Sequence, residues 1–134
     1  MILCPCHSGK TYDECCAPYH TGKRLAESAL FLMRSRYSAY AKGLVDYIIM
    51  TTHPENPPLK ESEKKRRENI IQFSRTTQFS GLEIVEFIDG EKEAFVTFKA
   101  KLFQNGADAS FQEKSRFLKV NGKWLYHSGS LTEL

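Results

Sequence analysis

From Gly81 onward the chain alternates apolar and polar residues, and Asn105-Gly106 and Asn121-Gly122 interrupt the alternation. Asn-Gly favours the two-residue turn of a β-hairpin, because both turn positions need a positive φ. These two pairs and Asp89-Gly90 separate four predicted strands, at Leu82–Ile88, Ala94–Phe103, Ala109–Val120 and Lys123–Ser128. The sequence therefore predicts a hairpin-linked antiparallel sheet.

Two-residue turns fix the register of the strands that they join, so the facing residues can be predicted. Counting outward from the two Asn-Gly turns gives these facing pairs: Ala94–Phe117, Val96–Ser115, Phe98–Glu113, Ala100–Phe111, Phe117–Tyr126 and Ser115–Ser128. His127 then falls on the other face of the sheet, beside Arg116.

One carboxylate, Glu113, lies within the apolar face that this register defines. The rest of that face is Val96, Phe98, Ala100, Leu102, Phe111, Phe117, Trp124 and Tyr126. A carboxylate on an apolar face is costly unless it is paired or hydrogen-bonded. We therefore expect Arg34 or Arg36, on a helix that covers this face, to pair with it, assisted by Tyr37 or Tyr40.

Before Gly81 the apolar residues recur at three- and four-residue steps, which indicates helices. A helical pattern runs over Leu25–Thr52, with Gly43 as an interruption and Leu44–Met50 as a second short helix. The stripe consists of Ala26, Ala29, Leu30, Met33, Tyr37, Tyr40, Ala41 and Leu44. A loop at Pro54–Pro58 and a surface helix at Lys60–Thr77 follow, whose basic run (residues 64–67) we interpret as a solvated face. Helices first and an antiparallel sheet second make the fold α+β.

All four cysteines lie in the first sixteen residues, as Cys4-Pro-Cys6 and Cys15-Cys16. Such clustering is typical of a tetrahedral Zn²⁺ site with four thiolate ligands, and a site with four protein ligands is structural. His7 and His20 are alternative ligands if one thiol does not coordinate, and unligated or redox-active thiols are the remaining interpretation. Lys10, Lys23 and Arg24 are expected to offset the negative charge of the thiolates.

Neighbouring cysteines are poorly placed to form disulfides with each other, although Cys4 to Cys15 or Cys16 is geometrically possible. Only Met1-Ile2-Leu3 precedes Cys4, which leaves no room for a secretory signal. We therefore expect a cytoplasmic protein, in which clustered cysteines more often bind metal.

The segment Cys4-Pro-Cys6-His7-Ser8-Gly9-Lys10-Thr11-Tyr12-Asp13-Glu14-Cys15-Cys16 resembles the SEC-C zinc-binding motif. That motif reads Cys-Pro-Cys-Gly-Ser-Gly-Lys-x-Tyr-x-x-Cys followed by His or Cys. His7 stands where glycine is usual, and Cys16 takes the last ligand position. The resemblance implies Zn²⁺ held by Cys4, Cys6, Cys15 and Cys16.

A second resemblance covers the remainder of the chain. The segment Leu32–Tyr40, Asp46-Tyr47, His53-Pro54 and the strand with Glu113, Ser115 and Phe117 are similar to the YchJ-like family. That family implies an NTF2-like cone, in which a curved sheet and helices enclose a cavity, and it supplies no established reaction. The chain then divides into a SEC-C motif at 1–22 and an NTF2-like domain at 23–134.

Three functions follow as hypotheses. The first is protein docking through the zinc knuckle, whose surroundings include Lys10, Tyr12, Tyr19, Lys23 and Arg24. The second is an enzyme or small-ligand binder that uses the cavity. Its catalytic candidates are Glu113, His53 and Arg36, and its ligand-binding candidates are Arg34, Arg36, Tyr37, Tyr40 and Glu113.

The third hypothesis is nucleic-acid binding, which ranks below the other two because the net charge of +3 is small and mixed in sign. No apolar run approaches the length of about 20 residues that spans a bilayer, so we expect no membrane role. Exposed faces of NTF2-like sheets often dimerise, and a homodimer is therefore an open alternative. Whether the chain catalyses any reaction also stays open, and no nucleophile–base pair or phosphate-binding loop favours an enzyme.

Overall fold

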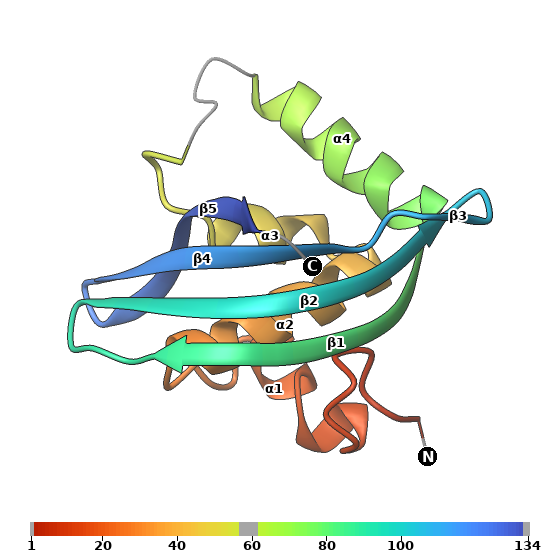
Figure 1. Ribbon diagram of the computed structural model, residues 1–134. Helices are drawn as coiled ribbons and strands as arrows, with labels where there is room; N and C mark the ends of the chain where they lie inside the picture. Colours follow the sequence, from red (N-terminus) through yellow and green to blue (C-terminus); the bar gives the residue numbers. More distant parts are fainter. Residues whose placement is uncertain (1, 57–61, 133–134) are drawn as a thin grey trace.

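The computed structural model describes residues 2–56 and 62–132. A curved antiparallel sheet has α1, α2 and α3 on one side and α4 near one end, with the amino-terminal segment beside β1 (Figure 1). The helices are α1 (Ala17–His20), α2 (Ala29–Lys42), α3 (Val45–Met50) and α4 (Glu63–Thr76), and a 3₁₀ turn, η1, covers Tyr12–Glu14. The strands are β1 (Thr77–Ile88), β2 (Glu93–Gln104), β3 (Ala107–Asp108), β4 (Phe111–Val120) and β5 (Lys123–Thr132).

Helix α2 is the central helix, and it starts later than the predicted Leu25. Its first turn is capped by Ser28, whose hydroxyl accepts the N–H of Phe31 at 3.3 Å. It ends where predicted, at Gly43, which has φ 73° and closes the helix in the left-handed conformation. Burial extends beyond the predicted stripe to Leu32, Ser35, Ser38 and Ala39. The helix packs against the sheet and also against α1, α3 and α4, so little of its circumference faces water.

Helix α4 begins after Ser62, whose hydroxyl accepts the N–H of Lys65 at 3.1 Å. Parts of the predicted loop Pro54–Pro58 and of the predicted helix Lys60–Thr77 fall in residues 57–61, outside the described residues. In the basic run Lys64 and Lys65 are exposed, and the half-buried Arg66 and Arg67 donate to Asn56 and Asp46. Within residues 2–56 and 62–132, every helix is too short or too polar to cross a bilayer.

The sheet has the order β1-β2-β4-β5, and β3 pairs with β2 beyond the first Asn-Gly turn. Asn105 and Gly106 have φ values of 51° and 79°, and Asn121 and Gly122 have 51° and 80°. Both turns are therefore two-residue turns, as predicted. Five predicted facing pairs are confirmed: Ala94–Phe117, Val96–Ser115, Phe98–Glu113, Ala100–Phe111 and Phe117–Tyr126.

The sixth predicted pair, Ser115–Ser128, is wrong. The register of β5 shifts by one after Tyr126, so Ser128 faces Arg116 and Gly129 faces Ser115. His127 is the extra residue of this bulge. The backbone of Tyr126 also bonds outside the sheet, because its N–H donates to Thr51 and its carbonyl accepts from His53.

One hydrophobic cluster joins the sheet, α2 and the cysteine segment. The predicted apolar face is buried at Val96, Phe98, Ala100, Leu102, Phe117 and Trp124 and half-buried at Phe111 and Tyr126. Leu32 and Met33 of α2 cover part of it, and Cys4, Cys6 and Cys16 belong to the same cluster. The amino-terminal segment therefore packs as part of the core of the sheet and helix.

Candidate metal centre and cavity

The first two cysteines lie on a tight turn. The N–H of Cys4 donates to the carbonyl of Lys10 at 2.9 Å, and Leu3 forms an antiparallel bridge with Thr11. The turn requires positive φ at Gly9 (87°) and at His7 (61°). A side chain at His7 is strained in that region, which explains why the SEC-C pattern has glycine there.

The four sulfur atoms form one cluster, in which all ligand atoms lie within 4.8 Å of one another. Cys15 Sγ lies 3.5 Å from Cys6 Sγ and 3.9 Å from Cys16 Sγ. Tetrahedral bonds of about 2.3 Å to Zn²⁺ place ligand sulfurs about 3.8 Å apart. These distances are too long for disulfides, and all four cysteines are free thiols. The residues therefore fit a metal ion with four sulfur ligands.

His7 and His20, the alternative ligands, are engaged elsewhere. His7 Nε2 lies 3.2 Å from the carbonyl oxygen of Phe79. His20 Nε2 lies 2.8 Å from the carbonyl oxygen of Ser35, and its Nδ1 lies 2.7 Å from the hydroxyl of Tyr12. Burial lowers the pKa of His20, which keeps its ring neutral in this arrangement. The cysteine cluster in the described residues includes neither histidine.

The cation that reaches the sulfurs is Arg34. Its Nη1 donates to the carbonyl oxygen of Cys6 at 3.2 Å and lies 3.9 Å from Cys6 Sγ. Lys10 and Lys23 are exposed, and Arg24 pairs with Glu27. Arg34, on the covering helix, is a cation beside the sulfurs that the sequence did not predict, and the predicted offset by Lys10, Lys23 and Arg24 stays a prediction. Arg34 is then also unavailable to Glu113.

The thiols differ in acidity. Hydrogen bonds from the thiols of Cys16 and Cys4 lower the pKa of Cys6. The hydrogen bonds of Cys16 to Cys4 and Cys6, and then its burial, raise its own pKa. These hydrogen bonds favour negative charge on Cys6 over negative charge on Cys16. A divalent cation is needed to hold all four sulfurs as thiolates.

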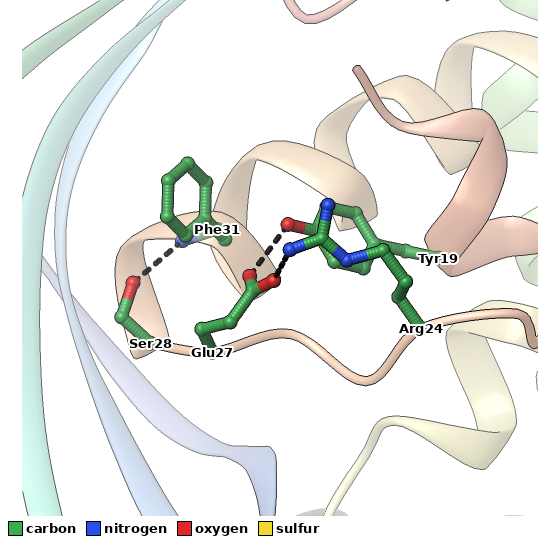
Figure 2. Close-up of polar contacts among 5 residues, drawn as sticks. All are labelled: Tyr19, Arg24, Glu27, Ser28 and Phe31. Atoms are coloured by element: carbon green, nitrogen blue, oxygen red, sulfur yellow. Dashed lines mark hydrogen bonds and ion pairs between the residues drawn. The ribbon is translucent and has the colours of Figure 1, made fainter. Parts of the chain in front are cut away.

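A second group of contacts ties α1 to the start of α2 (Figure 2). The hydroxyl of Tyr19 donates to Glu27 Oε2 at 2.6 Å, and Arg24 pairs with the other oxygen of Glu27. The ring of Tyr19 stacks on Phe31, with ring centroids 6.3 Å apart. Tyr19, expected on an exposed docking face, is therefore buried and holds the knuckle on α2.

A cavity of about 430 Å³ opens between α2, α4 and the sheet; we call it the cone cavity. Its wall is largely aromatic and aliphatic, with few polar groups. The lining residues are Met33, Arg36, Tyr37, Tyr40, Asn69, Ile70, Phe73, Phe79, Phe98, Ala100, Leu102, Phe111, Glu113, Ser115 and Tyr126. This volume is typical of a small-molecule site.

Glu113 is the carboxylate of the cone cavity, and neutral groups hold it. Its Oε2 accepts from Ser115 Oγ at 2.5 Å and from the hydroxyl of Tyr126 at 3.1 Å. Burial, and then the charge of Glu113, raises the pKa of Tyr126, so its hydroxyl stays protonated and donates. A β-carbon on Gly129 would overlap the Glu113 carboxyl group. Gly129 therefore leaves the space that the carboxylate occupies.

The expected ion pair between Glu113 and Arg36 or Arg34 is wrong. Within the described residues, no arginine, lysine or histidine nitrogen lies within 4.0 Å of the Glu113 carboxylate. Arg36 Nη1 donates to the Ile48 carbonyl at 3.0 Å and to the hydroxyls of Thr51 and Thr52 at 2.7 and 3.0 Å. Its guanidinium carbon lies 4.7 Å from the ring centroid of Tyr126. Arg36 thus fastens α3 to α2.

The two tyrosines expected near Glu113 do line the cone cavity, but neither bonds to the carboxylate. Burial raises the pKa of Tyr37 to about 12, and its hydroxyl donates to the carbonyl of Gly81 at 2.9 Å. Tyr40 packs edge-on against Phe73. These rings shape the wall of the cone cavity.

Two family descriptions match consecutive parts of the chain. Residues 2–18 match the SEC-C motif. Residues 28–129 match the family described as YchJ, middle NTF2-like domain. The chain belongs to the YchJ family. The NTF2-like α+β fold predicted from the sequence is confirmed as well.

Curated YchJ-family relatives align along nearly all of this chain. A UPF0225 protein of Vibrio parahaemolyticus is 39% identical over 132 residues, covering 97% of this chain and 75% of the relative. The UPF0225 protein YchJ of Shigella dysenteriae is 38% identical over 130 residues, covering 96% and 82%. The solution structure of a SEC-C motif containing protein from Rhodopseudomonas palustris has a TM-score of 0.86 at 34% identity, covering 98% and 100%.

The structure brings Gly129, which the sequence did not single out, to the Glu113 site of this YchJ-family chain. Ser115 was predicted to face Ser128, and the bulge places Gly129 opposite it instead. The bulge also turns His127 towards His53, with ring centroids 5.2 Å apart. His127, predicted on the other face of the sheet, is not among the described residues that line the cone cavity. His53 lies outside the lining of the cone cavity, which removes it from the Glu113 site.

Proposed function

We propose that this chain is a cytoplasmic zinc protein, in which Cys4, Cys6, Cys15 and Cys16 hold one Zn²⁺. The spacing of the sulfur atoms supports the proposal, because it matches a tetrahedral S₄ site. Zinc with four protein ligands has no open position, so it stabilises the fold and activates no water. Free thiols at this spacing suit a reducing compartment.

Metal analysis of the purified chain tests the zinc site. We expect about one Zn²⁺ per chain, and loss of that metal in Cys16→Ser. Ser8→Ala is the matched control, because it removes a hydroxyl 3.2 Å from Cys15 Sγ and leaves all four sulfurs in place. A zinc-free wild-type protein from zinc-supplemented cells, with four titratable thiols, contradicts the proposal.

The knuckle also offers a docking surface for a protein partner. Its inner side is buried on α2, but Ile2 and Leu3 are 80% and 64% exposed on its outer edge. Exposed apolar residues beside a rigid turn favour a partner with an apolar surface.

Capture of partners from a lysate of the native host tests this docking role. The double variant Ile2→Ser/Leu3→Ser keeps the backbone bridge of Leu3 to Thr11 and the sulfurs, so its metal content is unchanged. We expect this variant and Cys15→Ser to lose the same partner. A partner that both variants retain does not dock through the knuckle.

A second candidate function, small-ligand binding, is favoured by the cone cavity itself. The cavity combines an apolar wall with a carboxylate fixed by Ser115, Tyr126 and Gly129. An apolar pocket with few convergent polar groups is the usual form of a ligand site. A catalytic role would need a proton-transfer partner beside Glu113, and in the described part of the chain its carboxylate bonds to the hydroxyls of Ser115 and Tyr126.

Filling the cavity tests ligand binding. The neutral fluorophore 1-aminoanthracene should brighten on binding to the wild-type protein, because the wall is apolar. Ala100→Phe places a ring inside the cavity and should abolish the signal, whereas Ala107→Phe, on the exposed strand β3, should keep it. Circular dichroism checks that both variants fold. An equal signal from both variants contradicts binding in the cone cavity.

A further inference from the structure

The charges in the wall of the cone cavity are unequally available to a ligand. Glu113 and Arg36 are its only charged lining residues among those that the structure describes. Arg36 is 7% exposed, its Nη1 is shared among three acceptors, and the ring of Tyr126 lies against its guanidinium group. Its positive charge is directed at the carboxyl end of α3, where backbone carbonyls balance it. Among the residues that the structure describes, no cationic nitrogen lies within 4.0 Å of the Glu113 carboxylate.

Glu113 is half-buried. Hydrogen bonds hold its Oε2, and its Oε1 remains for a ligand. In the described residues, both side-chain hydrogen bonds to the carboxylate end on Oε2. Every buried side-chain oxygen or nitrogen in the described residues has a partner, so Oε1, which accepts no hydrogen bond there, is accessible to solvent. A carboxylate held rigidly at the edge of an apolar space gains most from a cationic donor, because charge-assisted hydrogen bonds are about twice as strong as neutral ones.

The rest of the wall suits the same kind of ligand. Tyr37, Phe79, Phe73 and Tyr40 form a chain of edge-to-face contacts, with interplanar angles of 86°, 83° and 83°. Rings turned at right angles to one another present faces as well as edges along the wall. Aromatic faces attract organic cations, and the attraction is greatest where water is excluded.

We propose that the cone cavity binds an organic cation, with an apolar or aromatic body against the rings and an amine or quaternary ammonium group beside Glu113. This proposal rests on the ligand-binding role of the cavity and names the chemical class that it selects. An anionic ligand held by Arg36 is the opposing possibility, and the same experiment distinguishes the two.

Three probes of similar size distinguish the effect of ligand charge on affinity from the effect of ligand shape. They are phenyltrimethylammonium, its uncharged isostere tert-butylbenzene, and the anion benzoate. Each is titrated into the 134-residue chain loaded with zinc and followed by two-dimensional NMR. We expect the cation to bind at least about tenfold more tightly than tert-butylbenzene. The largest shifts should fall on the amides of Ser115 and Gly129, which frame the carboxylate.

Variants then assign the preference to one residue. Glu113→Gln keeps an acceptor oxygen for Ser115 and Tyr126, and we expect the advantage of the cation to fall below about threefold. Glu93→Gln is the matched control, since it removes an exposed carboxylate paired with Arg116, outside the cavity, and should leave the advantage intact. The comparison of probes on the wild-type chain needs no variant, so poor folding of Glu113→Gln does not remove the test.

Each other outcome overturns the proposal. Equal binding of the cation and tert-butylbenzene leaves the ligand-binding role standing and rejects the choice of a cation. If benzoate binds most tightly, the ligand is an anion recognised by Arg36, and the proposal of a cation is wrong. A cation preference that survives Glu113→Gln rejects the role of Glu113. Binding of none of the probes, together with a negative fluorophore test, rejects the ligand-binding role itself.

Discussion

Replacing Gly129 by alanine should disturb the Glu113 site, although it removes none of the polar groups of that site. Gly129 faces Ser115 across β4 and β5, and the carboxyl group of Glu113 lies over its α-carbon. A β-carbon at this position overlaps the carboxylate and lies 2.8 Å from the Tyr126 hydroxyl. The Glu113 side chain must therefore leave its position in Gly129→Ala.

The expected loss of unfolding free energy in Gly129→Ala follows from the hydrogen bonds that the carboxylate loses. It loses hydrogen bonds from Ser115 at 2.5 Å and from Tyr126 at 3.1 Å. A hydrogen bond to a charged group contributes about 1.5–3 kcal/mol. Because Glu113 is half-buried and regains contact with water, we expect the lower end for the two together, about 3 kcal/mol. In a chain of this length, that loss lowers the melting temperature by about 10 °C.

Urea denaturation of a double-mutant cycle measures this coupling. In a Glu113→Ala background the carboxylate is gone, so Gly129→Ala should cost less than about 1 kcal/mol. Gly81→Ala on β1 is the control, because its new β-carbon meets only the flexible side chain of Lys101. Equal costs of Gly129→Ala in the two backgrounds would refute the reasoning.

Three further predictions concern the core and the metal. Phe117→Ala, at 1% exposed, should lower the unfolding free energy by about 3–5 kcal/mol in urea, whereas the more exposed Phe103→Ala should cost under about 1 kcal/mol; similar costs would contradict the assigned core. Chelation should lower the melting temperature by at least about 10 °C, because three cysteines belong to the main hydrophobic cluster; an unchanged melting curve would exclude a structural metal. Arg34→Ala should release zinc to a colorimetric chelator faster than Arg24→Ala, whose guanidinium group pairs with Glu27; equal rates would mean that Arg34 does not support the thiolates.

The register of the sheet could be predicted because local chemistry fixes it. Asn105-Gly106 and Asn121-Gly122 adopt positive φ at both positions, so each turn has two residues and every facing pair up to Tyr126 follows. The four cysteines could be assigned to one cluster because their spacing is itself the motif. These features depend on a few neighbouring residues, and tertiary packing does not change them.

The partners of the charged helix residues could not be predicted in the same way. Arg34 and Arg36 are two positions apart on α2, so they point in different directions. Which of them faces the knuckle and which faces α3 depends on the rotation of the helix against the sheet. The bulge at His127 has a similar origin, since Tyr126 bonds to Thr51 and His53 in a segment far away in the sequence.

Helix α2 contacts both sites, because Arg34 reaches Cys6 while Met33 and Tyr37 line the cone cavity. If the sulfurs bind a metal ion and the cone cavity binds a ligand, a ligand that shifts α2 on entering would change the affinity of the sulfurs for the ion. Thermodynamic reciprocity would then require the ion to change the affinity for the ligand by the same factor. Under both proposals, the two binding events would be coupled through α2, a helix of fourteen residues.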